Sequence, residues 1–193
     1  MLSAYGDYQN EIYFNALQGV LPELPMAYAE LEERARATLA PSVWSYVAGG
    51  AGDEATQRAN VEAFARWGLI PRMLVGAKPR DLSIELFGQR YPSPLLLAPI
   101  GVLGLCAQDG HGDLAAARAS AQSGVPMIAS TLSVDPLEDV ARDLGETAGF
   151  FQLYTPTDRD LAESLVHRAE AVPDTAGSSS RWTPGFPAGG RAT

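Results

Sequence analysis

Residues 126–154 decide the fold, and they read PMIASTLSVDPLEDVARDLGETAGFFQLY. Two short apolar runs, at 126–130 and 150–154, flank a helical stretch near 135–143. Continuous apolar strands that alternate with amphipathic helices are typical of βα units in a parallel sheet. The sequence therefore predicts an α/β fold.

The same alternation extends in both directions. An earlier apolar run at 95–99 is followed by a helical stretch near 109–123, and a helix near 158–170 follows the last run. The chain thus offers about three βα units. In a (β/α) barrel the carboxyl ends of the strands form the active-site face. The residues at the ends of these runs are Ile100-Gly101, Ser130-Thr131, Gln152 and Tyr154.

The first part of the chain is predicted to be an arm followed by a helix. Residues 1–25 form the arm, because Pro22 and Pro25 break any helix there. A helix is expected at 26–40, before Pro41 interrupts it. Its apolar face consists of Leu31, Ala35 and Leu39.

Further short elements follow. A second helix is expected at 42–48, and a third from an N-cap at Asp53 to about Trp67. Alternating residues from Leu82, turned at 87–89, predict a β-hairpin. Val61, Phe64 and Ala65 are expected to face inward.

These patterns divide the chain into three parts. Residues 1–80 are the arm and helical segment, and residues 81–171 hold the βα units. Residues 172–193 are rich in Gly, Pro and Ser without apolar periodicity, so they are predicted to be a disordered tail.

Composition excludes several classes of partner. The net charge is −9 and Lys78 is the single lysine, so nucleic acid and anionic membranes are disfavoured. Cys106 is the single cysteine, and no intramolecular disulfide can form. Residues 1–10 do not resemble a signal peptide, and no apolar run is long enough to span a bilayer, so a cytoplasmic protein is expected.

Four segments in order resemble the FMN-dependent α-hydroxy-acid dehydrogenase family, which includes glycolate oxidase, lactate oxidase and lactate 2-monooxygenase. The resemblance runs from about residue 5 to about residue 171, and Gly6–Tyr13 and Cys106–Asp113 are similar to the lactate 2-monooxygenase branch. The four segments are Ser45-Tyr46-Val47-Ala48-Gly49-Gly50-Ala51-Gly52-Asp53-Glu54, Leu97-Ala98-Pro99-Ile100-Gly101, Ser130-Thr131-Leu132 and Phe151-Gln152-Leu153-Tyr154.

The resemblance implies a partial TIM (β/α)8 barrel and the FMN-dependent oxidation of a small L-2-hydroxy acid such as lactate, with O2 reoxidising the flavin. It implies that full-length relatives are homo-oligomers. Tyr46 and Tyr154 match residues that bind the substrate, and a phenol is a good neutral donor to a carboxylate. The alternative for Tyr46 is a core tyrosine of a short helix.

The resemblance also implies the cofactor-binding residues. Pro99, Ile100 and Gly101 match a backbone segment that passes the flavin edge, and glycine permits that close approach. The alternative there is a plain turn. Ser130 and Gln152 match side chains that hydrogen-bond the ring. An unpaired amide inside an apolar strand is costly, so Gln152 needs a partner in any case.

The remaining reactive side chains are predicted to have structural or surface roles rather than catalytic ones. His111 is expected at a helix start as a capping or surface residue, His167 on a solvated helix face, and Cys106 as a buried small residue. The acidic run at Glu30, Glu32 and Glu33 is a solvated face, and no metal site is predicted.

The family pattern also includes an SNHGGRQ-like segment with the catalytic histidine and arginine, a strand lysine and glycine-rich phosphate loops, none of which occurs in the sequence. We therefore expect no catalytic residue in this chain and no activity of the chain alone. One hypothesis is that residues 172–193 are a frameshifted reading of a fourth βα unit, because shifted codons across 177–183 permit a buried strand. The alternatives are a genuine low-complexity tail and a non-catalytic fragment with an interaction or regulatory role.

Overall fold

The computed structural model describes residues 7–75, 81–172 and 183–184. The chain divides into two units, Met1–Ile70 and Pro71–Thr193, and each is described by itself below. Of the predicted tail at 172–193, only Val172, Thr183 and Pro184 are described, so the prediction of disorder falls on residues outside the described part of the chain.

The first unit is helical. Its first helix corrects the prediction of an arm at 1–25, because α1 ends before Pro22 and Pro25 and these prolines do not disturb it. The helices expected after the arm are present, and α3 begins with Pro41 at its first position, where the missing N–H of proline costs nothing. The helices are α1 (Asp7–Leu17), α2 (Tyr28–Thr38), α3 (Pro41–Ala48) and α4 (Ala55–Phe64).

A glycine-rich turn joins α3 to α4. The N-cap of α4 is Glu54, with φ 62°, so the predicted N-cap at Asp53 is wrong by one residue. The Asp53 carboxylate nevertheless accepts a hydrogen bond from the backbone N–H of Ala55 at 3.3 Å. The Glu54 carboxylate instead accepts from the N–H of Gly50 at 3.2 Å, which closes the turn.

The first unit buries no side chain among its described residues. Val61, Phe64 and Ala65 were predicted to face inward and are exposed, and Phe64 is 85% exposed. The prediction is wrong within this unit because none of its described residues covers these side chains. Periodicity can identify an apolar face, but it does not identify what covers the face.

The second unit opens with a hairpin of β1 (Ile84–Leu86) and β2 (Gln89–Tyr91), which confirms the predicted one. Its two turn residues, Phe87 and Gly88, both have positive φ, at 53° and 75°. Two such residues form the turn that matches the twist of paired strands.

The parallel sheet of the second unit has the order β3-β4-β5, with β3 (Met127–Ser130), β4 (Gly149–Gln152) and β5 (Thr183–Pro184). The run at 95–99 was predicted to be a strand but forms only one parallel bridge, from Leu97 to Met127. Pro94 precedes the run and Pro99 ends it, and neither has an N–H to donate, which limits the pairing of the run.

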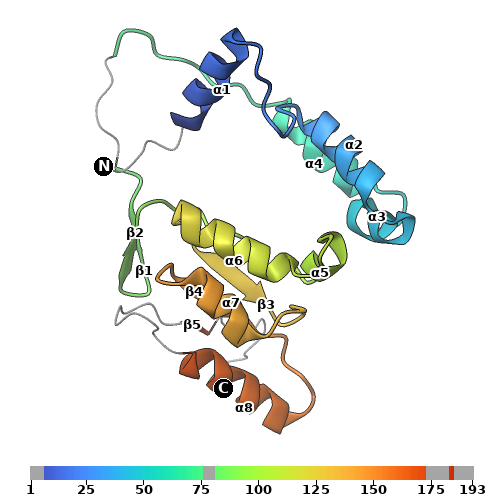
Figure 1. Ribbon diagram of the computed structural model, residues 1–193, viewed down its shortest axis with the longest axis vertical. Coiled ribbons are helices and arrows are strands. Elements are labelled where there is room, and N and C mark those ends of the chain that lie inside the picture. The colour runs from blue at the N-terminus through green and yellow to red at the C-terminus, as the bar shows by residue number, and fades with distance from the viewer. Residues whose placement is uncertain (1–6, 76–80, 173–182, 185–193) are drawn as a thin grey trace. The chain divides into compact units, whose positions relative to one another are not determined.

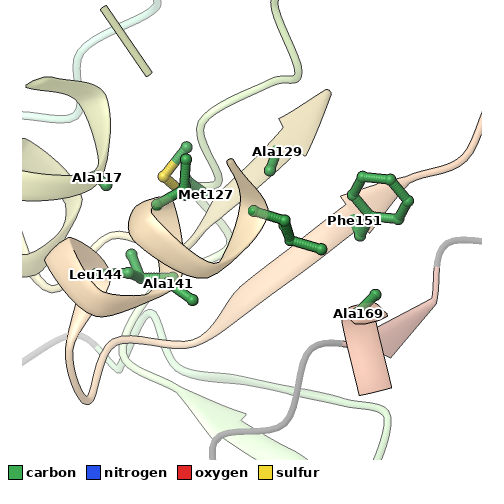
Figure 2. Close-up of a cluster of buried hydrophobic side chains, with 9 residues drawn as sticks. Ala117, Met127, Ala129, Ala141, Leu144, Phe151 and Ala169 are labelled. Carbon is green, nitrogen blue, oxygen red and sulfur yellow. The ribbon is translucent and has the colours of Figure 1, made fainter. Parts of the chain in front are cut away.

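Helices cover one face of this sheet, and α7 lies between α6 and α8 (Figure 1). They pack on the side chains of alternate strand residues, Met127, Ala129 and Phe151, which belong to a single buried cluster (Figure 2). The described helices are α5 (Leu103–Cys106), α6 (Gly112–Ser123), α7 (Leu137–Leu144) and α8 (Arg159–Ala171).

The opposite face of the sheet therefore presents Ile128, Ser130, Phe150 and Gln152. At the amino end of β4, the ring of Phe150 packs against Phe87 and Tyr91 of the hairpin, with ring centroids 6.1 and 6.3 Å apart. The hairpin thus lies at the amino end of this face, and Ser130 and Gln152 lie at its carboxyl end.

Candidate functional site

Ser130 and Gln152 are the last residues of neighbouring parallel strands, and they pair directly in register. Both side chains therefore leave the same face of the sheet. Ser130 is only 4% exposed, and its Oγ accepts a hydrogen bond from the N–H of Leu132 at 3.1 Å. That bond uses a lone pair and leaves the hydroxyl proton available for a further partner.

Gln152 is half-buried, and its carboxamide makes no hydrogen bond with any of the residues that the structure describes. Its backbone carbonyl accepts one from the hydroxyl of Thr131 at 2.5 Å. A carboxamide carries two donor hydrogens and an acceptor oxygen, and here they are left for solvent or a bound group. The arrangement therefore suits a bound group that offers both a donor and an acceptor to this strand end.

Tyr154 follows two residues after the end of β4. Its backbone N–H donates to the hydroxyl of Thr131 at 2.9 Å, and its side chain is 53% exposed. The phenol is thus accessible to a ligand.

The segment Pro99–Gly101 meets the same loop. A Cβ at Gly101 would lie 3.0 Å from the Cβ of Leu132, so the glycine lets this backbone approach the loop after β3 closely. Pro99 is half-buried and Ile100 is exposed. The structure therefore brings Gly101, Ser130 and Gln152 to one end of the sheet, as their places at run ends predict.

Tyr46 is placed differently. It lies on α3 in the first unit, where its side chain is 71% exposed. The alternative of a core tyrosine does not fit that exposure within the unit. Its place beside Tyr154 in a substrate site stays a prediction.

A cluster of charged side chains lies near this end of the sheet, at the start of α6. The ring Nδ1 of His111 lies 2.6 Å from the carboxylate of Asp135, and the hydrogen bond and charge of Asp135 raise the pKa of His111 above its ordinary value. The other Asp135 oxygen accepts from the N–H of Leu114 at 3.3 Å, while Asp113 accepts from the N–H of Val134 at 3.2 Å.

His111 occupies the N-cap position of α6 and its ring is mostly exposed, as predicted. The sequence did not reveal its partner, because Asp135 is 24 residues away and no local motif links the two. His167 is exposed on α8, also as predicted. Cys106 was predicted to be buried and is only partly so.

A hollow of about 240 Å3 lies beside the loop after β3, between α7 and α8. Its lining is mainly apolar, with Val140 and Leu165 from the helices and Phe151 from β4. Asp135 and Arg168 line it too, but each already has an ionic partner. Among the described residues no cluster of three or more His, Cys, Asp or Glu could hold a metal ion, and no helix is long and apolar enough to cross a bilayer.

The strand-end arrangement can hold a planar polar ring, with a hydroxyl proton from Ser130 and an amide from Gln152 on one side and glycine backbone nearby. A model of the FMN-dependent dehydrogenase family matches residues 35–176, which span both units and every one of these positions. The chain belongs to this family. The resemblance found in the sequence is thereby confirmed.

Curated relatives agree with this assignment. The chain is 40% identical to an L-lactate oxidase of Lysinibacillus sphaericus over 148 residues, which are 77% of this chain and 38% of the relative. It is 37% identical to the FMN-dependent alpha-hydroxy acid dehydrogenase qulF of Penicillium citrinum over 167 residues, which are 86% of this chain and 41% of the relative. The chain thus spans about two fifths of the length of the curated relatives it matches.

Solved structures agree as well. A lactate oxidase of Pediococcus acidilactici, termed putative in its description, superposes with a TM-score of 0.69 at 31% identity, over 78% of this chain and 42% of that one. A mandelate oxidase variant with an FMN adduct gives a TM-score of 0.64 at 36% identity, over 73% of this chain and 42% of that one. The expectation of a partial TIM barrel is confirmed. N-terminal helices are followed by βα units, although the first βα unit lacks its predicted strand.

Proposed function

We propose that this chain forms the part of an FMN-dependent site that holds the flavin ring and one side of a small L-2-hydroxy acid, as in lactate 2-monooxygenase. The observation that supports it most directly is the pairing of Ser130 with Gln152. Their side chains share one face at the carboxyl end of a parallel sheet, and the amide of Gln152 has no partner among the described residues.

The residues present fit a flavin ring. Its polar edge has both donors and acceptors, and the Gln152 amide and the Ser130 hydroxyl can satisfy one of each. Gly101 has no side chain to separate its backbone from a planar ring. Pro99 and Ile100 continue that backbone segment. When bound, FMN supplies the acceptor for the hydrogen and electron pair removed from a 2-hydroxy acid.

The substrate side of the proposal rests on two tyrosines. Their phenol groups are exposed and can donate hydrogen bonds to a carboxylate without adding charge. Tyr154 is held by its backbone next to Gln152, and Tyr46 would contribute from α3. L-lactate is the proposed substrate, because L-lactate oxidases are among the relatives, and O2 is the proposed oxidant.

The 193 residues alone are proposed not to turn over substrate. Removing a hydroxyl proton needs a base within hydrogen-bond reach of it. His111 is bound to the buried carboxylate of Asp135, and His167 lies on the exposed face of α8 beside Glu170. Neither histidine lies on the strand-end face with Ser130 and Gln152.

Two assays test the proposal. The purified chain should quench the fluorescence of added FMN, and Gln152→Leu should weaken that binding roughly tenfold, as expected for one lost buried hydrogen bond. Gln122→Leu is the matched control, because Gln122 is exposed on α6. L-lactate should produce no oxygen uptake until the chain is co-expressed with the remaining part of an L-lactate oxidase. FMN binding that is equal in both leucine variants would contradict the ring site, and oxygen uptake by the chain alone would contradict the predicted inactivity.

The alternative is an interaction fragment without catalysis. It is favoured by the exposed apolar side chains at the end of the first unit, where Trp67, Leu69 and Ile70 are almost fully exposed within that unit. Groups of this kind mark interaction surfaces. Co-purification with an intact relative, together with no FMN binding, would favour this alternative over the ring site.

A further inference from the structure

Thr131 joins the two strand ends of the candidate site. Its hydroxyl donates to the backbone carbonyl of Gln152 at 2.5 Å and accepts from the backbone N–H of Tyr154 at 2.9 Å. The paired register of β3 and β4 ends one residue earlier, at Ser130 and Gln152. The threonine side chain therefore continues the link between the strands where backbone pairing stops.

This link acts on the two residues proposed to face ligand. A hydrogen bond to the carbonyl of Gln152 and another from the N–H of Tyr154 fix the backbone on both sides of Leu153. The directions of the Gln152 and Tyr154 side chains follow from that backbone. The hydroxyl of Thr131 has already given its one proton, so it has none left for a ligand of its own.

We propose that Thr131 is a positioning residue, which holds Gln152 against the flavin ring and Tyr154 against the substrate. This inference rests on the proposed function, since it assumes the ring site at Gln152. Thr131 touches neither cofactor nor substrate in this account and acts only through the two residues it holds.

The loop around Thr131 has other supports, so a substitution there can be interpreted locally. The N–H of Leu132 donates to the Ser130 hydroxyl, and the N–H of Ser133 donates to the Ser130 carbonyl at 3.1 Å. The Ser133 hydroxyl donates to the Asp135 carbonyl at 3.0 Å. Thr131→Val keeps the shape of the side chain and removes only the link, whereas Thr131→Ser keeps the hydroxyl.

Two readouts on the full chain test the proposal. The first is the hydrogen-exchange rate of the Tyr154 amide, followed by NMR without FMN. The second is the dissociation constant of FMN, followed by flavin fluorescence and absorbance. Thr147→Val is the matched control, because the Thr147 hydroxyl makes no hydrogen bond within the described part of the chain.

Thr131→Val should speed exchange at Tyr154 by about tenfold and weaken FMN binding by a comparable factor, as expected for the loss of a single hydrogen bond. Thr131→Ser should restore both, and Thr147→Val should change neither. If Thr131→Val leaves exchange or FMN binding unchanged while the wild type binds FMN, the positioning role is wrong and the ring site stands. If the wild type does not bind FMN, the proposed function itself is wrong, whatever the exchange rates show.

Discussion

Glu138 on α7 and Arg168 on α8 form the ion pair that joins the two helices over the sheet. The guanidinium Nε and one Nη of Arg168 lie 2.8 and 2.7 Å from the two carboxylate oxygens of Glu138, which is a bidentate arrangement. Hydrogen bonding to Arg168, a backbone hydrogen bond and, to a smaller extent, the charge of Arg168 lower the pKa of Glu138 to about 2 from the usual 4.5. Replacing Glu138 by Gln removes the charge and keeps the size.

The lowered pKa of Glu138 sets an upper limit on the stability that the ion pair contributes. A pKa lowered this far corresponds to about 3 kcal/mol of stability for a shielded group. The side chains of Arg168 and Glu138 are 46% and 42% exposed, so solvent screening reduces the expected loss to about 1 kcal/mol. Because the folded-state pKa lies below the unfolded value, this stability is present above pH 4.5 and disappears as pH falls through the folded-state pKa of about 2.

Urea unfolding followed by circular dichroism measures this effect. At neutral pH Glu138→Gln should lower the free energy of unfolding by about 1 kcal/mol, and the difference from wild type should shrink towards about pH 2. Glu163→Gln is the matched control, because Glu163 pairs with Arg159 within the exposed surface of α8. This substitution should cost only about 0.3–0.5 kcal/mol. Equal losses in both variants, or a Glu138 difference that persists in acid, would refute the reasoning.

Three further predictions concern the packing and charges around α6 and α7. Gly112→Ala should destabilise the chain by about 1–3 kcal/mol in urea unfolding, because the new Cβ would lie 2.6 Å from the carbonyl carbon of Leu103. Leu144→Ala should cost about 2–5 kcal/mol in the same assay, because Leu144 is 2% exposed within the core. The pKa of His111 is raised by Asp135, so the pair stabilises the fold fully below the ordinary pKa of 6.5 and less as pH rises through the folded-state value. His111→Asn should therefore reduce the urea midpoint at mildly acidic pH and match wild type at high pH, and an unchanged acid midpoint would contradict this.

Local patterns predicted much of the second unit. The runs at 126–130 and 150–154 and the helices after them are short-range features of hydrophobic order, and the structure has β3, β4, α7 and α8 close to those positions. The hairpin followed from alternation and from Gly88 in its turn. These elements were predictable because each depends on residues close together in the sequence.

Features that depend on distant partners were not predictable. The run at 95–99 has strand character, but its pairing depends on which N–H groups meet Met127, and it forms only one bridge. The inward face expected for Val61 and Phe64 needs a covering surface, which the first unit does not supply. Helix α1 ends at Leu17, and a proline restricts only its own helical turn and the residue before it, so Pro22 and Pro25 do not exclude this helix.

In the candidate site, too, residues marked by local patterns were predictable, and contacts between distant residues were not. Ser130, Gln152 and Gly101 could be selected because each ends an apolar run and matches a family motif. The two hydrogen bonds of the Thr131 hydroxyl could not be predicted from sequence, since their partners are backbone atoms 21 and 23 residues away. The pairing of His111 with Asp135 was hidden for the same reason.

The most direct test of the central claim is to locate FMN on this chain by NMR. Adding FMN to isotopically labelled protein should shift the backbone amides of Ile100, Gly101, Ser130 and Gln152, and should leave α6, at the helix-covered face, unshifted. That result would place the flavin ring at the carboxyl ends of β3 and β4. No shifts on saturation with FMN, or shifts centred on Val140, Leu165 and Arg168, which line the hollow from α7 and α8, would contradict the account.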